Sequence, residues 1–373
     1  MTMNRGVISD NLRRLRSIKG LNQTQIAKKA GLSRPSYVAI ENGSTDPRSS
    51  TLMNIAGALD VSLPDLFRPL PSLKRVRFRI QKTMTKRQEN QRDQLLQDVA
   101  VWLSDYNDLE KMLEVSRKYK FKDYRESNPV RASLEARKML GVKDGELIRD
   151  ICGLVENAGI KVYLSKTGFK KYFGLSVSVE DGGPAICVKV GDDVSVERQI
   201  FTVAHEMGHL LMHRSSYKKD EIKEIDREEK EADIFASHFL MPQSVFDKEW
   251  QAARGLHFVD RVLHIKRIFR VSYMTVLLRL ITCGSADSSI IQIFRAEYKQ
   301  LYHHDLKNHY EPESYSESEP EGLVKSDFMD DRLHRLVRDS FEKELISMDR
   351  AAEILKISLV EMRALNNSWN MAD

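Results

Sequence analysis

The sequence is poor in cysteine and contains no long apolar run. Its three cysteines, Cys152, Cys187 and Cys283, are widely separated and form no Cys-x-x-Cys pair. This spacing argues against a disulfide framework or a cysteine zinc site and favours a reducing compartment. No stretch approaches the roughly 18 uncharged apolar residues that a membrane span needs, and residues 1–10 lack the apolar core of a secretory signal. We therefore expect a cytoplasmic protein without a membrane partner.

Basic charge is concentrated near the N-terminus, although the 373 residues carry a net charge of only +5. Residues 1–80 hold 14 Lys or Arg and 5 Asp or Glu. A basic block on a nearly neutral body is typical of a nucleic-acid-binding module. A solvated surface is the alternative, and charge alone does not decide between the two.

The first 67 residues predict a compact all-α domain of five short helices. The expected helices span residues 11–19, 22–30, 34–41 and 50–59, and a short fifth helix follows Ser62. Asn22 and Ser33 can cap the second and third helices, and Gly31 permits the turn between them. The small core between these two helices is expected to consist of Ile26, Ala27, Ala30, Leu32, Val38 and Ile40.

This pattern resembles the Xre, lambda-repressor-like helix-turn-helix family throughout residues 12–67. In such a domain the third helix enters the major groove of double-stranded DNA, with its first residues toward the base edges. The candidate base contacts are Arg34, Ser36 and Tyr37. Arg34 can form a bidentate pair with guanine.

Further polar residues flank the expected recognition helix. Gln23 and Gln25, at the start of the second helix, are expected to touch phosphate or to brace the recognition helix. The candidate contacts to the DNA backbone are Asn42, Arg48 and Ser49. A double-stranded DNA operator is therefore the expected partner, and a protein–protein module is the alternative.

Residues 70–130 are expected to form a basic linker followed by a long helix. Residues 68–79 are rich in proline and basic residues, and a helical stretch covers residues 86–118. Along this stretch an apolar stripe runs from Leu95 to Leu113 at three- and four-residue steps. Such a stripe must be buried. Packing on the chain's own domains and a homodimer interface are both compatible with the spacing.

The motif His205-Glu206-Met207-Gly208-His209 lies within an expected helix that Ser195 caps and that ends near His213. Positions four apart project from the same face of a helix, so the two imidazoles can bind one Zn²⁺. Zinc lowers the pKa of a bound water to about 7, and Glu206 can then take its proton as the water attacks a peptide carbonyl. This chemistry is metal-assisted peptide hydrolysis.

The next helix offers the third ligand. Glu229 follows His209 by 20 residues, and Asp233 lies four residues further on the same face. One carboxylate can bind the metal while the other accepts a hydrogen bond from a ligand histidine. Glu231 is the competing ligand, and Glu228 is a weaker alternative. Two solvated helices with incidental His and Glu are the structural alternative.

Two other residues near the motif have less defined roles. His213 lies too far along the helix to share a metal with His205, so we expect either a supporting residue beside the site or a solvated histidine. Cys187 lies on the strand expected before the metal helix, where a core position is favoured over a thiol switch. An extended substrate can pair with the edge of such a strand.

The two runs VERQIFTVAHEMGHLLMH and EEKEADIFASHFLMP resemble the ImmA/IrrE family of bacterial zinc metallopeptidases, and the resemblance covers roughly residues 132–284. It implies Zn²⁺ bound by His205, His209 and Glu229, with Glu206 as general base, in an α+β zincin-like domain. Members of this family cut helix-turn-helix repressors in mobile-element or DNA-damage responses. Some relatives fused to a DNA-binding domain act instead as transcription regulators, occasionally with an eroded metal motif. Here the motif is intact, which favours activity.

The whole sequence predicts a multidomain protein. Its expected parts are an all-α helix-turn-helix domain at residues 1–69, the linker and long helix at 70–130, the α+β metallopeptidase domain at 131–285, and a mainly helical C-terminal extension at 286–373. The peptidase domain should contain helices at 132–140 and 146–157 and strands at 160–164, 173–179 and 185–190. The acidic tract 311–321 is typical of a disordered linker, and residues 347–365 suggest two helices and a second helix-turn-helix-like unit.

These features predict a transcriptional regulator that is also a zinc endopeptidase. Its expected substrate is a specific protein, either a helix-turn-helix repressor or its own segment between residues 68 and 86, cleaved in a stress or mobile-element response. One alternative is a transcription factor whose zincin-like domain senses a ligand without catalysis. Another is a component of a toxin–antitoxin pair.

Overall fold

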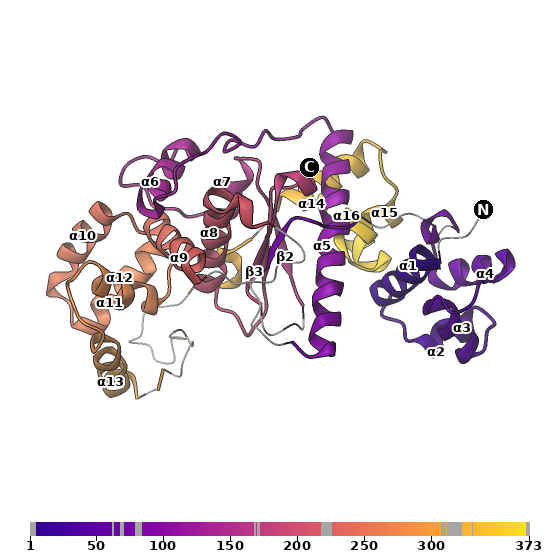
Figure 1. Ribbon diagram of the computed structural model, residues 1–373, viewed down its shortest axis with the longest axis horizontal. Coiled ribbons are helices and arrows are strands. Elements are labelled where there is room, and N and C mark those ends of the chain that lie inside the picture. The colour runs from indigo at the N-terminus through magenta and orange to yellow at the C-terminus, as the bar shows by residue number, and fades with distance from the viewer. Residues whose placement is uncertain are drawn as a thin grey trace. The chain divides into compact units, whose positions relative to one another are not determined.

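The protein divides into two compact units, each of which contains separate stretches of the sequence. The computed structural model describes residues 5–61, 63–67, 71–78, 84–167, 169, 172–217, 226–303, 305–306, 311, 323–329 and 331–370. The first unit comprises Met1–Ser72, Ala100–Glu114 and Leu333–Asp373, and the second comprises Leu73–Val99 and Val115–Arg332. Figure 1 shows a long helix, α5 (Lys86–Met112). One boundary between the units falls inside α5, between Val99 and Ala100, and another falls just after it, between Glu114 and Val115. The prediction of a multidomain protein is confirmed.

The N-terminal part of the first unit is entirely helical, as predicted. Its elements are α1 (Arg5–Ile18), α2 (Gln23–Lys29), α3 (Arg34–Glu41), α4 (Ser49–Leu59) and the 3-10 helix η1 (Leu63–Leu66). Asn22 caps α2 in a reciprocal capping box with Gln25, and the Ser33 side chain accepts a hydrogen bond from the Ser36 amide at the start of α3. These local signals explain why the ends of α2 and α3 were predictable within a residue.

The core of these helices differs from the prediction at one pair of neighbours. Ile26, Ala27, Ala30 and Ile40 are buried as expected, and Leu32 packs against them half-buried. Val38 is only half-buried, whereas the ring of Tyr37 is buried completely. One residue along a helix turns the side chain by about 100°, so Tyr37 and Val38 face different sides of α3 and only one of them faces the core.

The C-terminal helices of the first unit are α14 (Arg332–Glu342), α15 (Met348–Leu355) and α16 (Leu359–Asn370). Ser347 caps α15, and the left-handed Lys356 ends it. The expected two-helix pattern is therefore present. Arg14 of α1 forms an ion pair with Glu353 of α15 at 3.0 Å, and Arg350 of α15 pairs with Asp105 of α5. Residues from both ends of the sequence thus contribute to one unit.

The second unit is built on a four-stranded sheet with the order β1-β3-β4-β2. The strands are β1 (Val76–Phe78), β2 (Lys161–Ser165), β3 (Gly174–Val177) and β4 (Ala185–Lys189). β3 runs antiparallel to both β1 and β4, and β2 runs parallel to β4. Because β4 lies between two strands, the expectation that an extended substrate pairs with its edge is wrong. β3 is also covered on both edges, because it pairs with β4 on one side and with β1 on the other.

Strand β1 was not predicted, since it lies in the stretch assigned to the basic linker. Its three residues are too few for an alternating pattern to stand out among prolines and basic residues. Lys74 and Arg75 donate their backbone N–H groups to the Asp181 carboxylate, and Arg75 accepts a hydrogen bond from the Ser178 amide at 3.0 Å. The linker therefore enters the sheet of the second unit.

The α-helices described in the second unit besides its part of α5 are α6 (Pro129–Leu140), α7 (Ile151–Glu156), α8 (Val196–Met212), α9 (Asp226–Leu240), α10 (Gln243–Ala252), α11 (Phe258–Phe269), α12 (Tyr273–Thr282) and α13 (Ile290–Tyr302). α7 packs against β2 and α8 against β3 and β4, whereas α10–α13 pack against one another away from the sheet (Figure 1). α7 is shorter than predicted because Asp150 caps it, accepting from the Gly153 amide at 2.8 Å. The single-turn helices η2 (Val179–Asp181), η3 (Arg214–Ser216), η4 (Ala253–Gly255) and η5 (Lys325–Asp327) lie in the connections.

The apolar stripe of α5 is buried within the chain. The side chains buried along it are Leu95, Val99, Trp102, Leu103, Tyr106 and Leu109. α5 ends at Met112, earlier than expected, and Leu113 is half-buried. Packing inside one chain accounts for the stripe, and the homodimer stays a prediction.

Two other expectations concern the rest of the chain. Across the described ranges, no helix has both the length and the apolar character needed to cross a membrane. Residues 312–321 of the expected acidic linker lie outside the described residues. Its first residue, Glu311, is described and forms an ion pair with the buried Lys266 at 3.0 Å.

Candidate metal centre and helix-turn-helix surface

The two motif histidines face each other on α8. The Ser195 side chain accepts from the Arg198 amide at 3.3 Å and starts the helix, so His205 and His209 lie in its regular interior, four residues apart. Their Nε2 atoms are 3.1 Å apart. Both side chains are buried beneath the neighbouring elements.

Glu229 of α9 completes the group. Because Gly208 has no side chain, α8 and α9 can approach closely. A Cβ at this position would lie 3.0 Å from the ring of Phe235. One Glu229 oxygen lies 3.3 Å from His205 Nε2, and the other lies 3.3 Å from His209 Nε2. Among the described residues, these three form the one cluster of His, Cys, Asp or Glu with potential ligand atoms this close together.

The donor spacing fits a tetrahedral metal. Zinc bonds of about 2.0–2.1 Å place neighbouring ligand atoms about 3.3 Å apart. The observed separations of 3.1 and 3.3 Å agree with this value. Two imidazoles and one carboxylate are also the donor set of catalytic zinc sites, which keep a fourth position open.

Each histidine is oriented through its second ring nitrogen. His205 Nδ1 lies 2.8 Å from the Asp233 carboxylate. His209 Nδ1 lies 2.8 Å from Nδ1 of His213, whose Nε2 is 3.0 Å from Glu231. A proton on the Nδ1 atoms of His205 and His209 and on Nε2 of His213 satisfies all three contacts and leaves both ligand Nε2 atoms free to bind a cation.

The competing candidates have other partners. Glu231 pairs with His213 and Arg227, and Glu228 pairs with Arg77 and accepts from Ser216. His213 is buried, so the solvated alternative for this residue is wrong. Neither Glu228 nor Glu231 belongs to the group of potential ligands.

Burial and neighbouring charged groups shift the pKa values of the three potential ligands. Burial lowers the pKa of His205, but hydrogen bonds with Asp233 and Glu229 raise it to about 9. Burial raises the pKa of Glu229, and the two histidines reverse this effect and lower it below its ordinary value. Burial alone dominates at His209, whose pKa is well below the ordinary value. An ionised Glu229 and a neutral His209 are the forms that a metal requires.

The Glu206 carboxylate is held by two hydroxyl groups linked in series, an arrangement that the sequence did not predict. The Ser176 hydroxyl on β3 donates to Glu206 at 2.6 Å, and the Tyr217 hydroxyl donates to Ser176 at 2.9 Å. Burial raises the pKa of Glu206, while His205 and the Ser176 hydrogen bond oppose the rise. A Cβ at Gly174 would lie 3.1 Å from the Glu206 side chain, so the strand passes close to this carboxylate.

Arg77 was also missed. It lies on β1, is 9% exposed, and forms ion pairs with Glu228 and with Glu229, the latter at 2.9 Å. Nothing in a basic, proline-containing stretch distinguishes this arginine from its neighbours. Its role emerges only from the pairing of β1 with β3.

In the helix-turn-helix domain, some of the residues predicted to contact DNA are exposed and one is buried. Arg34 and Ser36 are exposed in the first turn of α3, and Ser36 Oγ lies 2.7 Å from Ser33 Oγ. The exposed polar residues around them are Gln25, Asn42, Arg48 and Ser49. The placement of Tyr37 corrects the prediction of a base contact, because its ring fills the core at 0% exposure.

Gln23 braces α3. Its side-chain amide donates to Glu41 at 2.6 Å, and Glu41 also accepts from Arg16 at 2.6 Å and from the Tyr37 hydroxyl at 3.2 Å. Of the two roles expected for Gln23, the structure places it in the bracing one. The buried Glu41 thus joins α1, α2 and α3.

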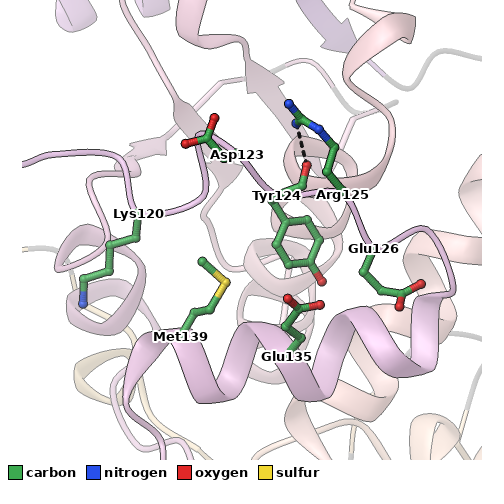
Figure 2. A pocket seen from close by; sticks show the side chains of 7 residues that line it. All are labelled: Lys120, Asp123, Tyr124, Arg125, Glu126, Glu135 and Met139. Atoms are coloured by element: carbon green, nitrogen blue, oxygen red, sulfur yellow. Dashed lines mark hydrogen bonds between the residues drawn. The ribbon is translucent and has the colours of Figure 1, made fainter.

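A surface pocket of about 480 Å³ lies beside α6. Figure 2 shows Tyr124 near Glu135 and Met139 of that helix, with charged side chains around them. Its lining residues are Lys120, Asp123, Tyr124, Arg125, Glu126, Glu135 and Met139. None of them belongs to the metal group, and the mixture of both signs of charge favours no single class of ligand.

Comparison with known families supports both resemblances. Residues 12–66 match the model described as helix-turn-helix, and residues 155–280 match the model described as IrrE N-terminal-like domain. β1 and α6 therefore lie outside the second match, which is shorter than the stretch of 132–284 expected from the sequence.

Individual relatives match a short part of the chain. The chain is 45% identical over 62 residues to an HTH-type transcriptional regulator of Bacillus subtilis (strain 168), which covers 17% of this chain and 53% of that protein. It is 35% identical over 60 residues to an HTH-type transcriptional regulator of Methanocaldococcus jannaschii, covering 16% of this chain and 91% of that protein. A regulator of the same type from Sinorhizobium fredii is 35% identical over 65 residues, or 84% of its length. The chain thus spans about half of the Bacillus relative.

Proposed function

Because this chain belongs to the HTH-type transcriptional regulators and carries an IrrE N-terminal-like domain, we propose that it is a DNA-binding regulator and a zinc-dependent endopeptidase. One observation carries the enzymatic part. His205, His209 and Glu229 bring three potential donor atoms within 4.8 Å of one another, and Glu206 is next to His205 on α8. A site that only sensed a ligand would need no general base.

The residues divide the chemistry among them. Bound zinc supplies a Lewis acid for the peptide carbonyl and acidifies a water molecule. Glu206 accepts the proton of the attacking water and passes it to the leaving amine. Ser176 and Tyr217 hold the Glu206 carboxylate in place, while Asp233 and the His213–Glu231 pair fix the ligand rings.

The DNA-binding part rests on α3. Its exposed first turn offers Arg34 and Ser36 to the major groove of an operator, and Asn42 and Arg48 remain candidates for phosphate contacts. The cluster around Glu41 fixes the angle of this helix against α1 and α2. The basic block of residues 1–80 favours DNA over a protein partner.

For the substrate, we favour a separate helix-turn-helix repressor. Self-cleavage between residues 68 and 86 is less compatible with the sheet, because residues 76–78 form β1 and would have to leave it first. A ligand sensor without catalysis and a toxin–antitoxin component remain the alternatives.

The test compares cells that carry the wild-type protein or Glu206→Gln under DNA damage or mobile-element stress. New protein termini should appear on one or a few repressors with the wild type and be absent with the variant. Glu135→Gln, an exposed substitution on α6, is the matched control. Termini spread over many unrelated proteins would indicate a general protease, and no difference between strains would favour the sensor.

A further inference from the structure

The metal centre includes a buried side chain from outside the IrrE-like region. Arg77 precedes residues 155–280 in the chain and reaches the site only because β1 adds to the sheet. Its Nη2 donates to Glu229 Oε1 at 2.9 Å, and its Nη1 donates to Glu228 Oε2. One guanidinium therefore connects two neighbouring carboxylates of α9.

This contact acts directly on the carboxylate that faces the two histidines. Glu229 Oε1 accepts from Arg77 and also lies 3.3 Å from His209 Nε2, while Oε2 lies 3.3 Å from His205 Nε2. An arginine fork is planar and rigid, so its two nitrogens, one bound to Glu228 and one to Glu229, fix the Glu229 carboxylate relative to its neighbour on α9. Glu228 balances the positive charge of Arg77, which would otherwise repel a nearby cation.

Packing and strand pairing fix the position of β1, and with it the position of Arg77 beside Glu229. Phe78 stacks on Phe169 and Tyr172, with ring centroids 5.9 and 5.6 Å away. Arg77 lies opposite Ser176 in the register of β1 and β3. Directly opposed residues project from the same face of an antiparallel pair. One register position thus supplies a partner for Glu229 and a partner for the base Glu206.

We propose that Arg77 is a positioning residue of the metal centre, which holds Glu229 in its ligand orientation and makes β1 part of the peptidase. This inference rests on the proposed zinc function. Loss of a residue that orients a ligand typically weakens metal affinity by about 10- to 100-fold.

The test measures the zinc dissociation constant of the full chain by competition with a chromogenic chelator. Arg77→Met keeps the length of the side chain and removes its charge and donors, whereas Arg77→Lys keeps the charge and loses the fork. The matched control is Arg75→Ala, an exposed arginine just before β1. We expect affinity to fall about 10- to 100-fold in Arg77→Met, to fall less in Arg77→Lys, and to stay unchanged in the control.

Circular dichroism of the metal-free variants separates loss of the site from loss of the fold. Wild-type affinity in folded Arg77→Met overturns the inference while the proposed function stands. If that variant does not fold, wild-type affinity in Arg77→Lys has the same meaning. A wild-type chain that binds no zinc overturns the proposed function together with the inference.

Discussion

Three acidic side chains within one turn of α9 have different sets of partners. Glu229 contacts both ligand histidines and Arg77, Glu228 contacts Arg77, and Glu231 contacts His213. Successive residues of a helix point about 100° apart, so a shift of one or two positions changes which atom a carboxylate can contact. Substitutions that differ by two positions should therefore have very different effects on the metal.

The wild-type chain should hold about one zinc ion, and Glu229→Gln should lose most of it. A neutral amide is a poor substitute for an ionised ligand, while Glu231→Gln removes only a distant support of His209. Elemental analysis of the purified proteins at limiting zinc checks both. Loss of zinc from Glu231→Gln alone would make Glu231 the third ligand.

Tyr217→Phe should lower peptide turnover by roughly fivefold, the effect of losing one buried hydrogen bond of about 1 kcal/mol. The phenol holds Ser176, which in turn holds Glu206, and it does not contact the metal ligands. Turnover of a fluorogenic peptide library and zinc content are measured together. Turnover that falls only in proportion to a reduced zinc content would assign Tyr217 a purely structural role in the site.

At the scale of elements, α3 has an exposed face that is a candidate for DNA contact and an inner face that packs in the core. Its first turn carries exposed Arg34, and one turn further its inner face carries buried Tyr37. The sequence places both residues at the start of the same amphipathic helix, but only packing reveals which of them faces DNA. Their substitutions should therefore separate recognition from stability.

Arg34→Ala should weaken binding to the specific operator by about 1–3 kcal/mol and flatten the base preference. Tyr37→Phe should keep that preference and lower the stability of the helical domain by about 1 kcal/mol, because it removes the bond to Glu41. Binding to operator variants and thermal unfolding distinguish the two. A base preference altered by Tyr37→Phe but not by Arg34→Ala would reverse the assignment.

The junction of α1, α2 and α3 at Glu41 should make this domain sensitive to acid. Burial raises the pKa of Glu41, but hydrogen bonds from Arg16 and Gln23 reverse this effect and lower it below the ordinary 4.5. A depressed pKa stabilises the folded state above the ordinary value, and this stability is lost as the pH falls from 4.5 through the folded pKa. Hydrogen exchange of α1–α3 in wild type and Glu41→Gln should differ at neutral pH and converge in acid. A constant difference would mean that the charge of Glu41 is unimportant.

Helical spacing made most of the metal site predictable. His205 and His209 share a face of one helix, and Glu229 and Asp233 share a face of the next, so each pair is linked by local geometry. Ser176, Tyr217 and Arg77 come from β3, from the residue after η3 and from β1. Their meeting depends on strand pairing between residues about a hundred positions apart, as in the register of Arg77 with Ser176, which no local pattern encodes.

At the scale of the whole molecule, the order of residues along the chain differs from the grouping in space. The sequence suggested four consecutive segments, whereas each compact unit combines separate stretches. Charge remains the property that is best read from the sequence, because it needs no knowledge of packing.

The 14 basic residues of the first 80 should give DNA binding a steep dependence on salt. Counterions released from phosphate drive such binding, and affinity typically falls by about three orders of magnitude or more between 50 and 200 mM salt when six or more phosphates are contacted. Fluorescence anisotropy with duplex DNA over this range measures the slope. Affinity that is nearly independent of salt would favour a protein-binding role for this domain.

The placement of β1 also determines where the chain can be shortened without harm. A fragment cut to residues 155–280 would match its family model and still leave the row of N–H and C=O groups on β3 without the strand that covers it. Uncovered strand edges recruit strands from other molecules and lead to aggregation. A peptidase fragment that remains dispersed in solution must therefore begin ahead of Leu73, at the end of what reads as the DNA-binding domain.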